Sequence, residues 1–304
     1  MNDVLVVGLA GFAASFVDGA LGMGFGPTSS SILLSSGLSP AGVSTTVNLA
    51  KVATGIVGGI AHWRFGNVDR RLVARLAIPG AIGALVGTLI LTNVDGDDLR
   101  PVLAALLLLI GLRILVRFRG RSGRTAAAMG DPDLRGVEVA GAAGGVTNGL
   151  IGAWGPVVTP FLLHRRVAPR IVVGSVNTAE IAVAVVAAGS LLGSQRDGIE
   201  GATVAAMLIG GVLAAPVAAL TVRHVPARLL GVLVAGLLLL TNTRELAIWA
   251  DAGWLRWVAY AVVVLAVLAA AWPFADRERR GGTGQAPLDH AATGATPDRS
   301  SGGA

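Results

Sequence analysis

Hydrophobic residues run along this chain in stretches of about 20, and most of the charged residues lie between them. A helix needs about 20 apolar residues to cross the hydrocarbon core of a bilayer. The pattern therefore predicts an all-α polytopic membrane protein with eight to nine spans. The apolar runs occupy residues 4–21, 42–62, 72–93, 101–116, 137–151, 171–193, 201–222, 229–249 and 254–274.

Glycine and proline interrupt two of these runs. The first break lies in the stretch Asp18–Ser31, and the second lies in the stretch Thr147–Pro156. Inside a helix glycine costs about 1 kcal/mol and proline about 3 kcal/mol, so the helix is predicted to stop at both places. Short apolar pieces at 27–36 and 156–163 follow. Ten residues of helix rise only about 15 Å, half of a bilayer, so we expect two re-entrant half-helices whose opened backbone lines a cavity.

The breaks recur at an offset of 129 residues, which indicates an internal duplication. The matching pairs at this offset are Gly26 and Gly155, Pro27 and Pro156, Pro40 and Pro169, and Asn48 and Asn177. Broken segments at corresponding places in two halves are typical of secondary transporters, where they mark the substrate site. The predicted organisation is a first repeat over 1–117, a linker over 118–135, a second repeat over 136–250, a terminal span over 251–275 and a disordered tail over 276–304.

Composition agrees with a membrane protein and excludes several classes of function. Of the 304 residues, 53% are hydrophobic and 14% charged, with mean hydropathy +0.71, whereas soluble domains carry about 25% charged residues. The pI near 11.2 does not indicate nucleic-acid binding, because the arginines flank apolar spans. The chain has no cysteine, which excludes thiolate metal sites and cysteine nucleophiles. It also lacks the GxxxxGK(S/T) motif, which excludes an ATP-hydrolysing site built on a phosphate-binding loop. No side chains have metal-ligand spacing, so no metal or other cofactor is expected.

The arginines also predict orientation in the cell membrane. Residues 64–75 and 117–135 hold nine arginines, whereas the connection 94–100 holds one. The positive-inside rule places the linker in the cytoplasm, and the tail with it. If residues 137–163 enter and return on one side, the two repeats are inverted; if they cross once, the repeats are parallel. The arginine balance favours inverted, pseudo-symmetric repeats.

An anion site is predicted at the two breaks. Glycine lets backbone N–H groups approach a ligand, and the N-terminus of the following half-helix adds partial positive charge. The alternative is that these glycines only allow close helix packing. The candidate residues are Gly24, Gly26, Gly152 and Gly155 in the turns, with Thr28 and Ser29 as hydroxyl donors.

Charged residues inside two apolar runs add a second candidate feature. Asn48 and Lys51 lie three residues apart on one helix face, and Asn177 and Glu180 repeat this spacing in the second half. Both charges lie near the membrane midplane, where an ionisable group indicates a functional site. We expect the two to approach each other, with Lys51 contacting the anion and Glu180 carrying coupled protons. The alternative is a structural ion pair between the halves.

Two aromatic residues, Phe25 and Trp154, occupy equivalent places in the two breaks. They either close the site as gates or fill gaps between helices, and packing is the commoner role of a buried aromatic. Asp69 precedes an apolar run and is predicted to cap the helix that begins there.

These motifs together resemble the TauE/SafE family of sulfite-exporter-like membrane proteins. The residues that carry the resemblance are Gly22 to Pro27, Ser39-Pro40, Ser44-Thr45-Thr46, Ala61 to Asp69, Gly152 to Pro160 and Val173-Gly174-Ser175. The resemblance covers about residues 4–249, and it adds Thr45 and Ser175 to the candidate residues. Ser31 stands where the second half has Pro160, so the two half-helices are not identical.

The resemblance implies a secondary transporter for a small anion, often a sulfur oxyanion or an organosulfonate. With the residue patterns, it predicts binding at midplane and alternating access, with the bilayer and coupled protons as the other partners and no nucleic acid. Two alternatives stay open. One is transport of a cation or neutral solute, coordinated by Asn48, Asn177 and Glu180. The other is a membrane-embedded enzyme, for which the chain offers only scattered Ser, His and Asp.

Overall fold

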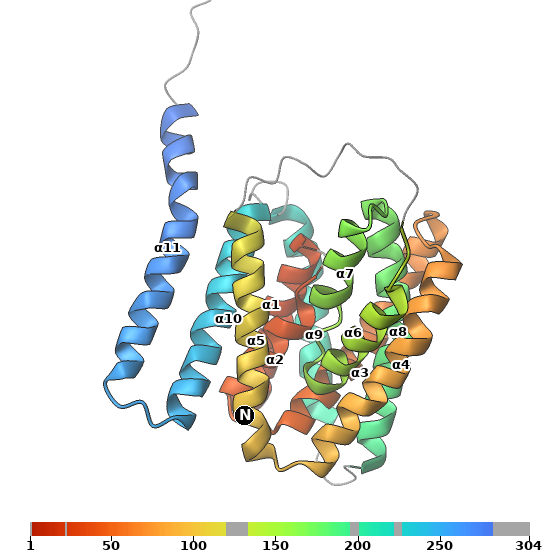
Figure 1. Ribbon diagram of the computed structural model, residues 1–304, viewed down its shortest axis with the longest axis horizontal. Coiled ribbons are helices and arrows are strands. Elements are labelled where there is room, and N and C mark those ends of the chain that lie inside the picture. Colours follow the sequence, from red (N-terminus) through yellow and green to blue (C-terminus); the bar gives the residue numbers. More distant parts are fainter. Residues whose placement is uncertain (1, 22, 120–132, 195–200, 222–226, 282–304) are drawn as a thin grey trace, which may run out of the picture.

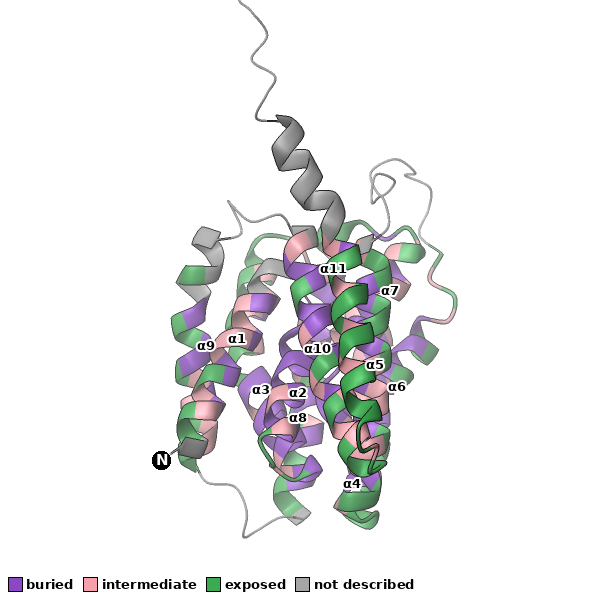
Figure 2. Ribbon diagram, turned by 90° about the vertical axis from the view of Figure 1, so that its left-hand side faces the viewer, coloured by how far each residue is buried: buried purple, intermediate pink, exposed green. Residues whose placement is uncertain are grey.

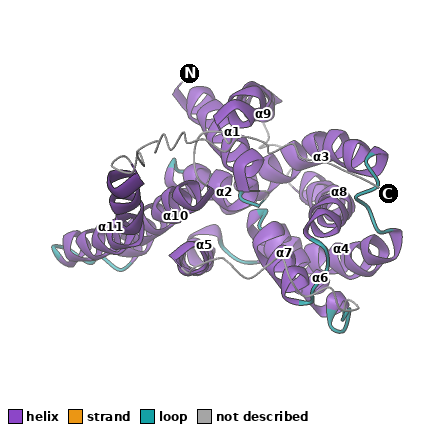
Figure 3. Ribbon diagram, turned by 90° about the horizontal axis from the view of Figure 1, so that it is seen from above, coloured by secondary structure: helices purple, strands orange, loops and turns teal. Residues whose placement is uncertain are grey.

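The computed structural model describes residues 2–21, 23–119, 133–194, 201–221 and 227–281, and these residues form helices and turns with no strand. The helices stand roughly side by side, with the last one at the edge (Figures 1 and 3). They are α1 (Asn2–Leu21), α2 (Phe25–Ser35), α3 (Pro40–Arg64), α4 (Arg70–Asn93), α5 (Gly96–Arg119), α6 (Val137–Ile151), α7 (Gly155–His164), α8 (Pro169–Ser194), α9 (Gly201–Thr221), α10 (Ala227–Trp249) and α11 (Leu255–Gly281).

Five helices are long and apolar enough to cross a membrane, namely α3, α4, α5, α8 and α10. In α1, α9 and α11 the described apolar stretches are shorter, at Val4–Asp18, Gly201–Ala214 and Leu255–Ala271. Large apolar side chains are exposed along the outer faces, for example Ile78 and Ile82 on α4, as lipid contact requires (Figure 2). The chain is therefore an all-α polytopic membrane protein.

Two of the predicted elements differ from the structure, one in whether it can span a bilayer alone and one in where it ends. The apolar run 137–151 forms a helix of only 15 residues, α6, which is too short to cross a bilayer alone. Helix α11 continues to Gly281, past the predicted start of the tail at residue 276, because residues 276–280 contain no glycine or proline. The remainder of the tail, and linker residues 120–132, lie outside the described residues.

Both glycine-proline breaks form helical hairpins. Helix α6 is capped at its C-terminus by Gly152, whose φ of 65° lies in the left-handed region that favours glycine. Helix α7 then returns over ten residues. The open end of this hairpin is joined by an ion pair between Asp133 and Arg165. In the first half, α1 is followed by the 11-residue α2, whose N-cap is Gly24 with an extended φ of 172°.

The two hairpins enter from opposite ends of the bundle. The α6–α7 hairpin opens beside the start of α4, where the Arg75 guanidinium donates to the Leu134 carbonyl at 2.9 Å. Helix α2 instead finishes beside the start of α5, where Arg100 donates to the carbonyls of Gly37 and Leu38 at 3.0 Å. Since α4 runs from the first of these places to the second, the hairpins point toward each other.

The main helix pairs each combine one helix from the first half with one from the second half. Helix α1 packs on α9, α4 on α6, α3 on α8 and α5 on α10. The α3 and α8 helices are antiparallel, because Asn67 contacts Gly174 whereas Gly55 contacts Ile181. The α4 and α6 helices are parallel and lie so close that a Cβ on Gly145 would overlap the Gly80 carbonyl.

Apolar side chains form two buried clusters that do not follow the two halves of the sequence. The larger involves mainly α1, α2, α3, α5, α9 and α10. The smaller involves α4, α6, α7 and α8, with Trp154 at its centre. Each cluster therefore contains helices from both halves, and the second break contributes to both, with Ile151 and Ala153 in the larger and Trp154 in the smaller.

Asp69 caps α4, as predicted: its carboxylate accepts hydrogen bonds from the N–H groups of Arg71 (2.8 Å) and Leu72 (3.1 Å). Its own N–H donates to the Ser175 hydroxyl at 2.9 Å. Asp69→Ala is expected to destabilise the protein by about 1 kcal/mol, because it removes the cap but no cavity residue. Thermal unfolding in detergent measures this, and Asp69→Asn, which keeps a capping oxygen, should retain most of the wild-type stability. Equal loss in both variants would contradict the capping role.

Candidate functional site

The two breaks contact each other through their backbones. A Cβ on Gly26 would overlap the carbonyl oxygen of Gly152, so only glycine allows this approach. The Ser30 hydroxyl donates to the Ile151 carbonyl at 2.6 Å, and the Ser44 hydroxyl donates to the Gly149 carbonyl at 2.6 Å. These bonds satisfy carbonyls at the end of α6 that have no partner within the helix.

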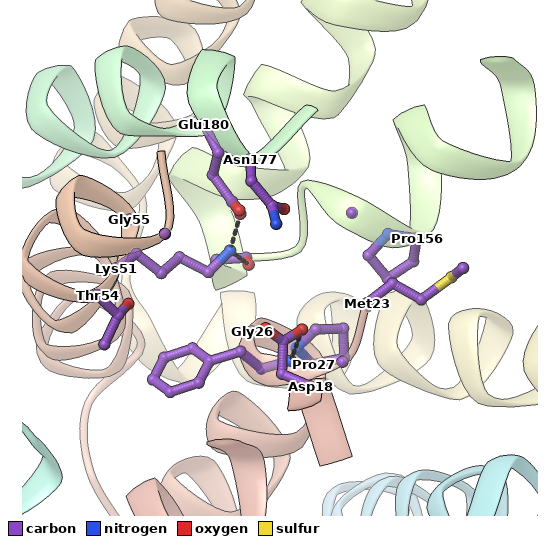
Figure 4. Close-up of a pocket in the computed structure, with 15 residues that line it drawn as sticks. Asp18, Met23, Gly26, Pro27, Lys51, Thr54, Gly55, Pro156, Asn177 and Glu180 are labelled. Atoms are coloured by element: carbon purple, nitrogen blue, oxygen red, sulfur yellow. Dashed lines mark hydrogen bonds and ion pairs between the residues drawn. The ribbon is translucent and has the colours of Figure 1, made fainter. Parts of the chain in front are cut away.

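A cavity of about 160 Å³ lies where the breaks meet (Figure 4). It is bounded by the end of α1, the N-termini of α2 and α7, and facing parts of α3 and α8. Its lining residues are Asp18, Met23, Gly24, Phe25, Gly26, Pro27, Lys51, Thr54, Gly55, Gly58, Gly152, Gly155, Pro156, Asn177 and Glu180.

Lys51 is the cation of this cavity, and its side chain is only 8% exposed. Its ammonium forms an ion pair with Glu180, whose side chain is 19% exposed. It also donates to the Gly152 carbonyl at 2.6 Å and to Asn148 Oδ1 at 3.3 Å. All three ammonium protons therefore have acceptors, two of them from the second break. Sequence reasoning predicted that Lys51 and Glu180 would approach each other, and they do.

Asn148 was not among the predicted site residues, although it lies inside the second break. Its amide donates to Asn48 Oδ1 at 2.6 Å, and the Asn48 amide donates back to the Asn148 carbonyl at 3.2 Å and to the Ser44 carbonyl at 2.9 Å. Asn48 thus lies behind Lys51 and orients Asn148 toward it. The sequence did contain a signal for Asn148. It belongs to the stretch that contains the second break, where an asparagine side chain can bond backbone groups that the helix end leaves open.

Asp18 is a second cavity residue that sequence reasoning missed. It ends the first apolar run, and its carboxylate Oδ1 accepts a hydrogen bond from the Phe25 N–H at 3.4 Å. Within the part of the chain that the structure describes, it forms no ion pair. Lys51 and Glu180 were selected because an ionisable residue in a membrane span indicates a functional site. The same reasoning applies to Asp18, which ends an apolar run beside a glycine-rich break.

Of the predicted site residues, eight line the cavity: Gly24, Phe25, Gly26, Lys51, Gly152, Gly155, Asn177 and Glu180. The other six do not, namely Thr28, Ser29, Thr45, Asn48, Trp154 and Ser175. The hydroxyls of Ser29 and Thr45 donate to carbonyls of their own helices, those of Phe25 (2.5 Å) and Ala41 (2.7 Å). Thr28 is fully buried, and its hydroxyl has no hydrogen-bond partner among the described residues. Helix rotation turns these hydroxyls away from the cavity.

Trp154 fills the space between helices and does not act as a wall of the cavity. It is fully buried against Gly80, Gly144 and Val183, and its indole N–H donates to the Val176 carbonyl at 3.1 Å. Its counterpart Phe25 does line the cavity. The gating hypothesis is therefore not supported for Trp154.

Trp154→Phe is expected to lower stability by roughly 2 kcal/mol, because it leaves a void and removes the indole hydrogen bond to the Val176 carbonyl. Transport below the melting temperature should remain close to that of the wild type. Flux in liposomes and thermal unfolding in detergent measure the two effects. A large loss of flux in a variant with nearly wild-type stability would restore the gating hypothesis.

A second hollow of about 300 Å³ adjoins the first and shares Met23 and Pro156 with it. It is mostly apolar, and its charged residues are Arg113 and Arg117 on α5. The Arg117 guanidinium lies 3.4 Å from the Met23 sulfur. This hollow leads from the central cavity toward the end of α5 and the linker.

Comparison with known proteins gives two matches. The family described as "Sulfite exporter TauE/SafE" matches residues 7–244. The "Probable membrane transporter protein YtnM" of Bacillus subtilis (strain 168) is 39% identical over 256 residues, which cover 81% of this chain and 83% of that protein. No solved structure matches the chain. The matched residues include both hairpins and every residue that lines the central cavity.

Proposed function

Because the chain belongs to the sulfite exporter TauE/SafE family of membrane transporters, and is therefore not an enzyme, we propose that it carries a small anion across the cell membrane. The central cavity is its binding site. The substrate is a sulfur oxyanion such as sulfite, or a small organosulfonate. The observation that carries this proposal is the buried Lys51 ammonium at the contact between the two broken segments.

The cavity offers an anion three sources of positive potential. Helix α2 begins at Phe25 and α7 at Gly155, and both N-termini reach the cavity lining. The first amides of a helix have no acceptor within it, and they carry part of the positive end of the helix dipole. Together with Lys51, two such ends resemble known phosphate and sulfate sites at helix N-termini. A cavity on the order of 150 Å³ holds a molecule the size of benzene, so a small oxyanion fits and a large organic anion does not.

The mechanism we propose is alternating access between two inverted repeats. The opposed entry of the two hairpins and the antiparallel packing of α3 on α8 support inversion, since a two-fold axis in the membrane plane reverses each helix. The cavity is lined by helices of both apolar clusters, and rocking of one cluster against the other would open it to alternate sides.

The orientation follows from the arginines. Arg64, Arg70 and Arg165 lie at the end of the bundle where the linker rejoins it, so we assign this end to the cytoplasm. The α3 residues that line the cavity run from Lys51 toward Arg64, and the hollow beside Arg117 leads to the linker. The described conformation therefore corresponds to a cavity facing the cytoplasm.

Flux into proteoliposomes tests the proposal. Sulfite, methanesulfonate, sulfate and sodium are supplied separately, and empty liposomes give the background. Saturable flux of at least one sulfur anion, with none of sodium alone, is the expected result. Sodium flux without anion flux would favour the cation alternative. Sodium is tested because the two carboxyl groups in the cavity could coordinate a cation. Absence of flux for all three anions would overturn the anion proposal.

A further inference from the structure

Charge is unevenly balanced in the central cavity. Its lining includes one cation, Lys51, and two carboxyl groups, those of Asp18 and Glu180. The other polar side chains in the lining, Thr54 and Asn177, are neutral. With all three groups ionised, the cavity has a net negative charge, and an entering anion would increase it. Binding of an anion is unfavourable unless one carboxyl group takes up a proton.

The two carboxyl groups have different partners. Glu180 is ion-paired with Lys51. Asp18 approaches from α1 and receives the Phe25 N–H at the long distance of 3.4 Å (Figure 4). Of the described residues, none forms an ion pair with it. Of two carboxyl groups near one ammonium, the unpaired one is the more easily protonated.

From this asymmetry we infer that Asp18 is the proton-binding group of the cavity, so that the anion and one proton bind together. Glu180 remains the ionised partner of Lys51. This inference deepens the proposed function and rests on it. It also changes a prediction made from the sequence, in which Glu180 carried the proton.

Proton and anion then favour each other reciprocally. An anion beside Asp18 makes release of its proton less favourable, and a proton on Asp18 removes the charge that repels the anion. Other charged groups do not reproduce this effect: Lys51 and Glu180 face the same cavity but are bound to each other, and Arg117 lies in the neighbouring hollow. A net neutral load, one anion with one proton, crosses the membrane.

Binding of methanesulfonate to the purified protein tests the inference, because this anion keeps a single charge between about pH 5 and pH 8. For the wild type we expect the apparent affinity to rise as pH falls, by up to tenfold per unit, the limit for one linked proton. Asp18→Asn mimics the protonated residue. At every pH, this variant should bind methanesulfonate as tightly as the wild type does at low pH. A pH gradient should no longer drive accumulation of the anion in liposomes.

Glu180→Gln is the matched control, since it neutralises the other carboxyl group in the same cavity. We expect its binding to remain pH-dependent through Asp18, with the dependence moved to lower pH, because the freed Lys51 ammonium favours ionised Asp18. If Asp18→Asn keeps the wild-type pH dependence, or if Glu180→Gln alone removes it, Asp18 is not the proton-binding group. Absence of binding of methanesulfonate, sulfite and sulfate at all pH values would instead contradict the proposed function itself.

Proton uptake gives a measurement that does not depend on folding of the Asp18→Asn variant. Methanesulfonate is added to wild-type protein in weakly buffered detergent solution, near the pH where affinity begins to fall. Uptake approaching one proton per bound anion is expected, and Asp18→Glu, which keeps a carboxyl group, should also take up protons. Binding without any proton uptake by the wild type overturns the inference.

Discussion

Gly26→Ala is expected to abolish transport and to lower stability by about 3 kcal/mol or more. The added Cβ would overlap the carbonyl oxygen of Gly152 and lie 3.2 Å from the Lys51 ammonium. Because the overlapping atom belongs to backbone, it cannot move aside as a flexible side chain would. Overpacking of a tight site usually costs about 1–3 kcal/mol, and a clash between two backbones lies at the upper end of that range. The two breaks would separate, and the cavity between them would change shape.

A matched control distinguishes this effect from the general effect of replacing glycine in a membrane helix. Gly189 on α8 has open space around its Cβ position, so Gly189→Ala should leave transport unchanged and slightly favour the helix. Thermal unfolding in detergent and anion flux in liposomes measure both variants. Wild-type flux and stability in Gly26→Ala would show that close contact between the breaks is not required.

The second large effect is expected for Lys51→Met, which should lower transport at least 100-fold and stability by about 3–5 kcal/mol. The substitution leaves the Glu180 carboxylate buried without its cation, and breaking a buried ion pair from one side costs about that much. The Gly152 carbonyl and Asn148 Oδ1 also lose their donor. An anion would then meet two carboxyl groups and no cation.

The double variant Lys51→Met with Glu180→Gln separates the binding role of Lys51 from a structural one. Replacing both partners of a buried pair removes the uncompensated charge, so stability should recover toward the wild-type value. Transport should not recover, because the cavity still lacks its cation. If the double variant transports at the wild-type rate, the pair only holds the two halves together, which is the structural alternative considered from the sequence.

Most of the elements that form the site could be predicted without coordinates. The half-helices at 27–36 and 156–163 correspond to α2 and α7, since glycine and proline end helices through local backbone properties. The approach of Lys51 to Glu180 was predicted because a charge in a membrane span needs a partner, and the duplication puts the two at equivalent positions.

Which of the predicted site residues line the cavity depends on how each helix is rotated about its axis. Thr28, Ser29 and Thr45 are polar residues near the breaks, yet none of them lines the cavity. Trp154 occupies the same place in its repeat as Phe25 but packs into the smaller apolar cluster. Rotation is set by what neighbouring helices bury, and some of these neighbours come from the other half of the chain, such as α4 for α6 and α10 for α2.

By itself, the sequence determined that this is a polytopic membrane protein with two broken helices and a buried charge in each half. Those features follow from the free-energy cost of exposing charged groups and unpaired backbone to lipid. This cost applies to every possible arrangement of the helices. Only the tertiary structure decided that the breaks touch, that Asn148 completes the coordination of Lys51, and that Asp18 shares the cavity without an ion pair to any described residue. These depend on packing between α1, α3, α6 and α8, which are distant in sequence and meet only when the two halves are assembled.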